Sequence, residues 1–164
     1  MTHTKTVPRL ATDPLKADHR HFAELFKEFA KLGEWALEKK VELFRTLTDR
    51  LAVHASIEEE QFYPALLRSV PSSDRAAILE AREEHKIVKR LLEELAELGP
   101  EDPEFDAKMK VLGEQVGHHA KEEEHELFPL FNVLPEGERK SLIRRLAARE
   151  EEWGVGQGDH PDGR

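Results

Sequence analysis

The segment VHASIEEEQFYP (residues 53–64) combines a histidine, a glutamate four residues later and a closing proline. Positions i and i+4 of a helix lie on the same face. His54 and Glu58 therefore share a stripe with the apolar residues Leu47 and Leu51. A buried, ionised glutamate costs several kcal/mol unless it is paired or bound to a cation. The segment thus predicts a helix whose inward face carries a glutamate that is paired with a positive group or bound to a cation.

A second segment, HHAKEEEHELFP (residues 118–129), has the same pattern. An interval of 65 residues relates three pairs: His54 and His119, Glu58 and Glu123, and Pro64 and Pro129. A lone His-x-x-x-Glu on a helix is usually a surface pair worth a few tenths of a kcal/mol. Two copies with the same proline spacing favour a shared role.

Two further histidines extend the repeat, because His19 and His85 are 66 residues apart and each lies on an apolar stripe. Their surroundings align as well, with DHRHFAELFKEFAKL matching EHKIVKRLLEELAEL. The chain is therefore a duplication of a helix–loop–helix unit. One unit cannot bury its stripe alone, whereas two units together form a four-helix bundle.

The predicted fold is all-α, an up-and-down four-helix bundle built from a duplicated helix pair, with a short C-terminal helix. Periodicity and breakers place the helices at about residues 13–33, 34–69, 74–98, 103–133 and 136–150. The predicted domain spans residues 13–150. A flexible segment, 1–12, precedes it, and a polar, glycine-containing tail, 151–164, is expected to be disordered.

Composition excludes several classes of function. The 164 residues suffice for one domain with a real core, and a net charge of −9 argues against nucleic acid or an anionic membrane as partner. Without cysteine the chain has no disulfide, thiolate zinc site or iron–sulfur cluster. It shows no membrane-length apolar run and no secretory signal, so we expect a cytoplasmic protein.

The buried polar residues point to a pair of metal ions. The candidate ligands are His19, His54, Glu58, His85, His119 and Glu123. Two glutamates facing each other would repel, and two divalent cations between them would remove that repulsion. Mixed imidazole and carboxylate ligands suit iron or manganese, whereas zinc usually takes four ligands in a closed tetrahedron.

The pattern H…HxxxExxxxxP, written twice over about residues 13–134, resembles the hemerythrin-like (HHE cation-binding) domain family. The resemblance implies a non-haem di-iron centre with two bridging carboxylates and an oxo or hydroxo bridge. The same six residues match the family's ligands. Oxygen-carrying members have a fifth histidine where this chain has Lys89, and the equivalent position in the first repeat is Ala23. The chain therefore resembles the four-histidine variety, which argues against reversible oxygen carriage.

The leading functional hypothesis is a di-iron protein that binds or senses small oxidants: dioxygen, peroxide or nitric oxide. The expected partner is thus a small diatomic or peroxide ligand. A second hypothesis is an enzyme that consumes peroxide or nitric oxide at the same metals. A third is iron storage or donation.

Some residues allow other interpretations. His118 and Glu122 form another His-x-x-x-Glu pair, but the proline spacing and the apolar stripe favour His119. His125 follows Glu122 with ferritin-type spacing, which that kind of site needs twice and the first repeat lacks. Lys89 either reaches into water from the edge of the stripe or approaches the metal pocket. The remaining alternative is a polar seam that binds no metal.

Overall fold

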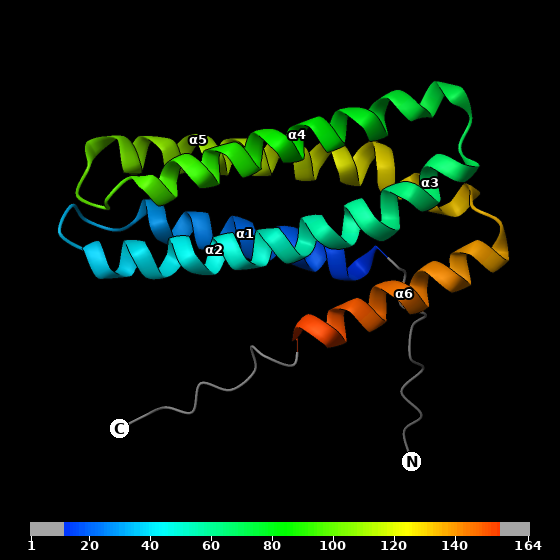
Figure 1. Ribbon diagram of the computed structural model, residues 1–164, viewed down its shortest axis with the longest axis horizontal. Coiled ribbons are helices and arrows are strands. Elements are labelled where there is room, and N and C mark those ends of the chain that lie inside the picture. Colours follow the sequence, from blue (N-terminus) through cyan, green and yellow to red (C-terminus); the bar gives the residue numbers. More distant parts are fainter. Residues whose placement is uncertain (1–11, 155–164) are drawn as a thin grey trace, which may run out of the picture.

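The computed structural model describes residues 12–154, which form helices joined by short turns and contain no strand. The long helices are α1 (Asp13–Ala30), α2 (Leu37–Ile57), α4 (Ser72–Glu97) and α5 (Pro103–Glu122). They lie alongside one another in an up-and-down bundle (Figure 1). The predicted all-α bundle is confirmed.

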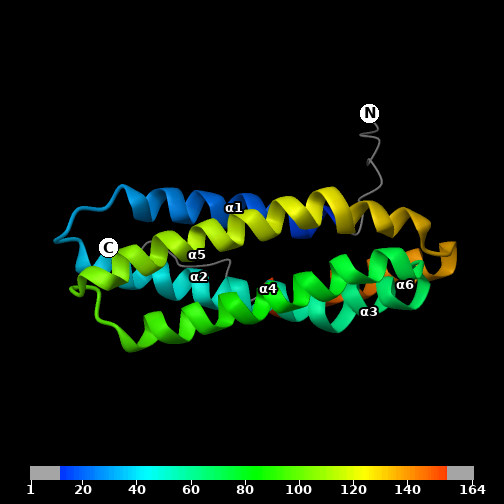
Figure 2. The ribbon, with the colours of Figure 1, turned by 90° about the horizontal axis from the view of Figure 1, so that it is seen from above.

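Each repeat contributes one pair of adjacent helices, and the two pairs also pack against each other. α1 packs against α2 within the first repeat, α4 packs against α5 within the second, and α1 also packs against α5. Figure 1 shows α1 and α2 in one layer and α4 and α5 in the other, and Figure 2 shows the same helices from above. The two units therefore pack face to face, because the apolar stripe of each unit is buried only against the other unit.

The first helix pair is joined by a longer turn than predicted. α1 ends at Ala30 instead of Gly33, and α2 begins at Leu37 instead of Glu34. Between them, the backbone N–H of Ala36 donates to the carbonyl of Gly33, three residues back. Tight three-residue bonds of this kind close turns at helix ends.

The predicted continuous helix 34–69 is instead interrupted at the ligand segment. α2 passes into a π-helical turn, η1 (Glu58–Phe62), followed by α3 (Tyr63–Ser69). The N–H of Tyr63 donates to the carbonyl of Glu58, five residues back. Pro64 has no N–H to continue the four-residue ladder, which explains why the extra residue is tolerated here.

The second repeat has the same interruption. α5 is followed by a π-helical turn, η2 (Glu123–Leu127), and a 3₁₀ helix, η3 (Phe128–Val133). The N–H of Phe128 donates to the carbonyl of Glu123, and Pro129 follows. Single π turns inside helices occur frequently at functional sites.

The last helix, α6 (Glu136–Gly154), extends four residues past its predicted end and packs on η1 and α2 (Figure 1). The rest of the predicted tail, 155–164, and residues 1–11 of the predicted leading segment lie outside the described residues. Within residues 12–154, no helix has the length and apolar composition needed to cross a lipid bilayer.

The apolar core consists of two clusters with a polar layer between them. Along α1, Leu15 belongs to one cluster and Phe22 to the other, and His19 lies between them. Along α2, His54 likewise lies between Leu51 and the segment that begins at Ile57. The sequence-predicted polar residues thus occupy one level of the bundle.

Candidate metal centre

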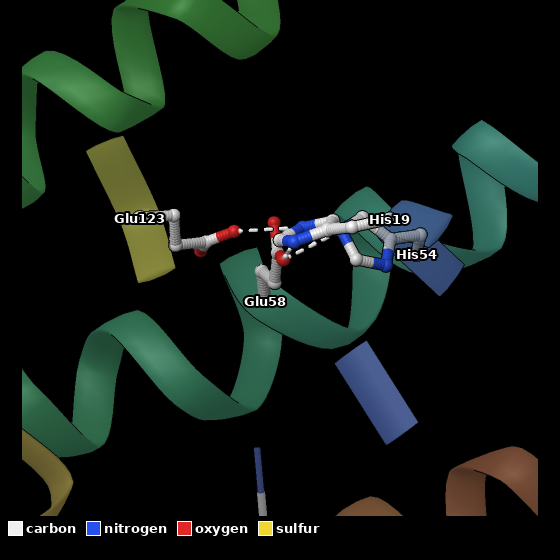
Figure 3. A group of neighbouring side chains, drawn as sticks. All are labelled: His19, His54, Glu58 and Glu123. Carbon is white, nitrogen blue, oxygen red and sulfur yellow. Dashed lines mark hydrogen bonds and ion pairs between the residues drawn. The ribbon is translucent and has the colours of Figure 1, made fainter. Parts of the chain in front are cut away.

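The six candidate ligands meet in the middle of the bundle. Each has no more than 7% of its surface exposed, and they comprise His19, His54, Glu58, His85, His119 and Glu123. Each histidine comes from a different long helix, and each glutamate begins a π-helical turn. Figure 3 shows four of the six, with Glu123 extending from η2 toward the first repeat.

The first ligand group combines His19, His54 and both glutamates. His54 Nε2 lies 2.7 Å from Glu58 Oε1, and His19 Nε2 lies 3.2 Å from Glu123 Oε2. The two Nε2 atoms are 3.2 Å apart. Every ligand atom of this group lies within 4.8 Å of the others, the spacing of groups that can surround one ion.

The second group contains His85, His119 and again Glu58. His85 Nε2 lies 3.0 Å from Glu58 Oε2 and 3.0 Å from His119 Nε2. Glu58 therefore directs one carboxylate oxygen toward each histidine pair. A carboxylate in that position is able to bridge two cations.

Two buried atoms support a cation in this cluster. Glu58 Oε1 and Glu123 Oε2 are buried without a hydrogen-bond partner among the described residues, although ring nitrogens approach them closely. Buried polar atoms in folded proteins are almost always satisfied. A divalent ion bound to each group would satisfy both oxygens and the facing imidazoles, so the cluster fits a metal site.

A ring of four carboxylates holds the outer nitrogens of these imidazoles. The Nδ1 contacts are His54 with Asp18 at 2.9 Å, His119 with Glu84 at 2.6 Å, His19 with Glu124 at 2.9 Å and His85 with Glu59 at 2.8 Å. Metal-bound histidines almost always donate their second ring N–H to such an acceptor, which fixes the tautomer and the ring orientation.

The carboxylate ring follows the duplication. Asp18 and Glu84 precede equivalent histidines, and each contacts the second histidine of its own repeat. Glu59 and Glu124 follow the equivalent glutamates, and each contacts the first histidine of the other repeat. Asp18 and Glu84 were not among the residues that the sequence pattern singled out.

The charges of the cluster shift the pKa values of its members. Burial lowers the pKa of His54, but the charge of Glu58 and the bond to Asp18 outweigh burial and raise it to about 10. For His119, burial is likewise outweighed by Glu58 and Glu123, which raise the pKa to about 9. Without a bound metal, the imidazoles of His54 and His119 therefore favour the protonated, positively charged form.

Tyr63 is a site residue that the sequence did not reveal. It is fully buried, and its hydroxyl donates to Glu123 Oε1 at 2.8 Å and lies 3.2 Å from Glu58 Oε2. Burial and the two carboxylates raise its pKa, so it remains a neutral donor. Its place beside Pro64, directly after the π turn, was the available signal.

A cavity of about 340 Å³ reaches the imidazoles from one side. All four histidines line it, together with apolar side chains such as Phe22 and Val88. Its exposed lining residues are Ala52, Glu60 and Lys89, so it opens between α2 and α4. Glu58 and Glu123 do not line the cavity, so its inner end faces the imidazole rings.

Lys89 and His118 both lie outside the two ligand groups. Lys89 lines the cavity with a half-exposed side chain, and its ammonium donates to both oxygens of Glu59, at 2.9 and 3.0 Å. His118 is exposed and pairs with Glu122 at 2.9 Å. His125 is also exposed, and its Nδ1 donates to the Lys121 carbonyl, away from the cluster.

Comparisons with known proteins agree with this site. The family model of the hemerythrin HHE cation binding domain matches residues 10–131. A crystal structure of a hemerythrin HHE cation binding domain-containing protein from Mycobacterium kansasii superposes with a TM-score of 0.73 and 25% identity, covering 90% of this chain and 89% of that one.

The chain is also similar to a curated protein, a DNA nickase from Nostoc sp.. The two are 30% identical over 116 residues, which is 71% of this chain and 32% of the nickase. The chain therefore spans about a third of the length of this relative.

Proposed function

The chain belongs to the hemerythrin HHE cation binding domain family, and from that premise we propose that it holds two iron ions and binds or senses small oxidants there. The oxidants are dioxygen, peroxide or nitric oxide. The single observation that carries this proposal is Glu58, whose two oxygens face two separate histidine pairs. Iron suits these mixed imidazole and carboxylate groups better than zinc does.

In this proposal His19, His54, Glu58 and Glu123 hold one ion, and Glu58, His85 and His119 hold the other. Bound iron would supply the redox change and the coordination position that such oxidants require. The chain's own residues orient the imidazoles through four carboxylates, and the apolar clusters on either side exclude water.

The cavity supports ligand binding over iron storage. It leads from the surface between α2 and α4 to all four histidines, and its inner lining is mainly apolar. Small, weakly polar molecules partition into such a space. An enzyme that consumes peroxide or nitric oxide would use the same entrance, so this second candidate differs from the first only in turnover.

The DNA-nicking activity in the relative's name is not part of the proposal. That protein is about three times as long as the matched part. The net charge of −9 on this chain opposes contact with DNA phosphates.

The first test is metal content by mass spectrometry on untagged protein from iron-supplemented cells. His119→Ala should lose one or both irons, whereas the adjacent, exposed His118→Ala should keep them. Zinc or no metal in the unmodified chain, or equal loss in both variants, would contradict the proposal.

Ligand titrations of the iron-loaded protein separate the candidates. Azide and nitric oxide should each perturb its absorption spectrum if the centre has an accessible position. Peroxide consumed in proportion to the iron supports binding or sensing, and consumption over many cycles supports the enzyme. Rapid iron loss to a weak chelator would favour storage or donation instead.

A further inference from the structure

The four carboxylates around the imidazoles are related in pairs by the duplication, but their surroundings are not. Glu59 contacts His85, and its counterpart Glu124 contacts His19, at nearly equal distances of 2.8 and 2.9 Å. Glu59 also accepts two hydrogen bonds from Lys89. Across the described residues, no lysine or arginine forms an ion pair with Glu124.

The cause of this difference lies in the sequence. The position equivalent to Lys89 in the first repeat is Ala23, which has no charge to offer. Glu59 Oε1 is therefore shared between an imidazole and an ammonium, 2.8 and 2.9 Å away, whereas Glu124 Oε1 serves one imidazole. A shared acceptor polarises its imidazole less, which makes that ring a weaker donor to a metal.

Two further features act in the same direction. Lys89 lines the same cavity as His85 and is connected to that ring through Glu59, so its positive charge opposes a cation bound by His85. The group that contains His85 also offers three imidazole and carboxylate ligands, whereas the group that contains His19 offers four. Ligand number, outer hydrogen bonding and local charge all weaken the same half of the centre.

We propose that Lys89 is a positioning residue that, through Glu59, makes the two metal positions unequal. The position formed by His85, His119 and Glu58 binds its ion more weakly, fills second and releases its ion first. The other position is the permanent one. This inference rests on the proposed two-metal function and adds to it the identity of the exchangeable ion.

The test is a titration of metal-free protein with Co²⁺, followed by calorimetry and by the visible absorption of bound cobalt. The unmodified chain should show two separate steps. His119→Ala should lose the weaker step and keep the tighter one, which assigns the steps to positions. Neither readout depends on an activity of the loaded protein.

Lys89→Met should increase the affinity of the second Co²⁺ step by about tenfold. That factor is the lower end of the effect that hydrogen-bond partners of ligand imidazoles have on metal affinity. Lys89→Arg, which keeps the charge, should behave like the unmodified chain. Glu59→Gln should weaken the second step by about 10–100-fold, and Glu124→Gln should weaken the first by a similar factor.

Lys86→Met is the matched control, because Lys86 is on the same helix but pairs with the exposed Glu83. It should leave both steps unchanged. Two equal steps in the unmodified chain, or a Lys89→Met variant that shifts both steps alike or neither, would overturn the inference while leaving the two-metal centre intact. Absence of any cobalt binding would overturn the proposed function itself.

Discussion

Glu58 and Glu123 occupy equivalent positions of the two repeats and are both buried, yet their pKa values shift in opposite directions. Burial raises the pKa of Glu58, but the charge of His54 and the close approach of three imidazoles lower it well below its usual value. Burial raises the pKa of Glu123, and the negative charge of Glu58 raises it further. Without metal, Glu58 therefore keeps its negative charge to a lower pH than Glu123 does.

The two glutamates should therefore differ when each is replaced by glutamine in metal-free protein. Glu58→Gln removes the partner of buried imidazolium groups and should destabilise the fold by about 3–5 kcal/mol. Glu123→Gln keeps the shape of the side chain and removes a negative charge that burial and Glu58 already disfavour, so it should change stability by less than about 1 kcal/mol. Urea unfolding in excess chelator measures both, and equal losses would contradict the assignment.

The stability of the metal-free protein should fall as the pH rises through the alkaline range. The pKa values of His54 and His119 are raised from 6.5 to about 10 and about 9. Groups with raised pKa values stabilise the fold fully below about pH 6.5, and this contribution is lost as pH passes their folded pKa values. We expect a loss on the order of a few kcal/mol between pH 7 and 10.

Chemical unfolding at fixed pH values tests this expectation, with metal-loaded protein as the control. The loaded protein should show a much flatter profile in the same range, because bound metal keeps both imidazoles neutral. Rising stability of the metal-free protein over this range would show that the imidazoles are not protonated in the fold.

Metal binding should release protons. At pH 7 His54 and His119 carry protons that a cation must displace, so metal affinity should increase with pH up to about 10. Calorimetric titration in buffers of different ionisation enthalpy counts the released protons. His118→Ala, at the exposed neighbour, should release the same number, and a pH-independent affinity would refute the protonated cluster.

Tyr63→Phe should destabilise the metal-free protein by about 1–3 kcal/mol, because it leaves a buried carboxyl group without its donor. The phenol ring and its packing against Phe62 are retained, so the loss reports the hydroxyl alone. Unfolding of Tyr63→Phe, Glu123→Gln and the double variant forms a cycle. Strictly additive losses would mean that the two side chains do not interact.

The sequence predicted the bundle and the six side chains that the structure brings together, because both predictions rest on helical periodicity and on a repeat interval that is easy to measure. Periodicity could not reveal the π-helical turns at Glu58 and Glu123, since one extra residue per turn does not disturb an i, i+4 pattern before it. The prolines at positions 64 and 129 were the visible sign. Their missing N–H groups end the regular ladder.

The partners of the imidazoles were harder to predict for another reason. Asp18 and Glu84 lie beside their histidines in sequence but contact histidines on neighbouring helices. Such contacts depend on how far one helix is rotated against the next, which a single sequence does not encode in any local pattern. Only the duplication constrains these contacts, because Asp18 and Glu84 occupy equivalent positions and should contact equivalent histidines.

The entrance to the cavity gives a final prediction about access. Ala52 is exposed and lines the cavity, so Ala52→Trp should fill the opening between α2 and α4 without touching a candidate ligand. Azide association with the iron-loaded protein should slow by roughly one order of magnitude or more, within the range that single substitutions produce in association rates. Iron content should not change.

Stopped-flow absorption measures that rate, and Ala76→Trp is the matched control, since Ala76 is exposed on α4 and does not line the cavity. The comparison removes any general effect of a surface tryptophan. If Ala52→Trp binds azide as fast as Ala76→Trp does, ligands reach the histidines by another path. The apolar lining would then be a packing defect beside the centre, and the argument that the cavity favours ligand binding over iron storage would no longer hold.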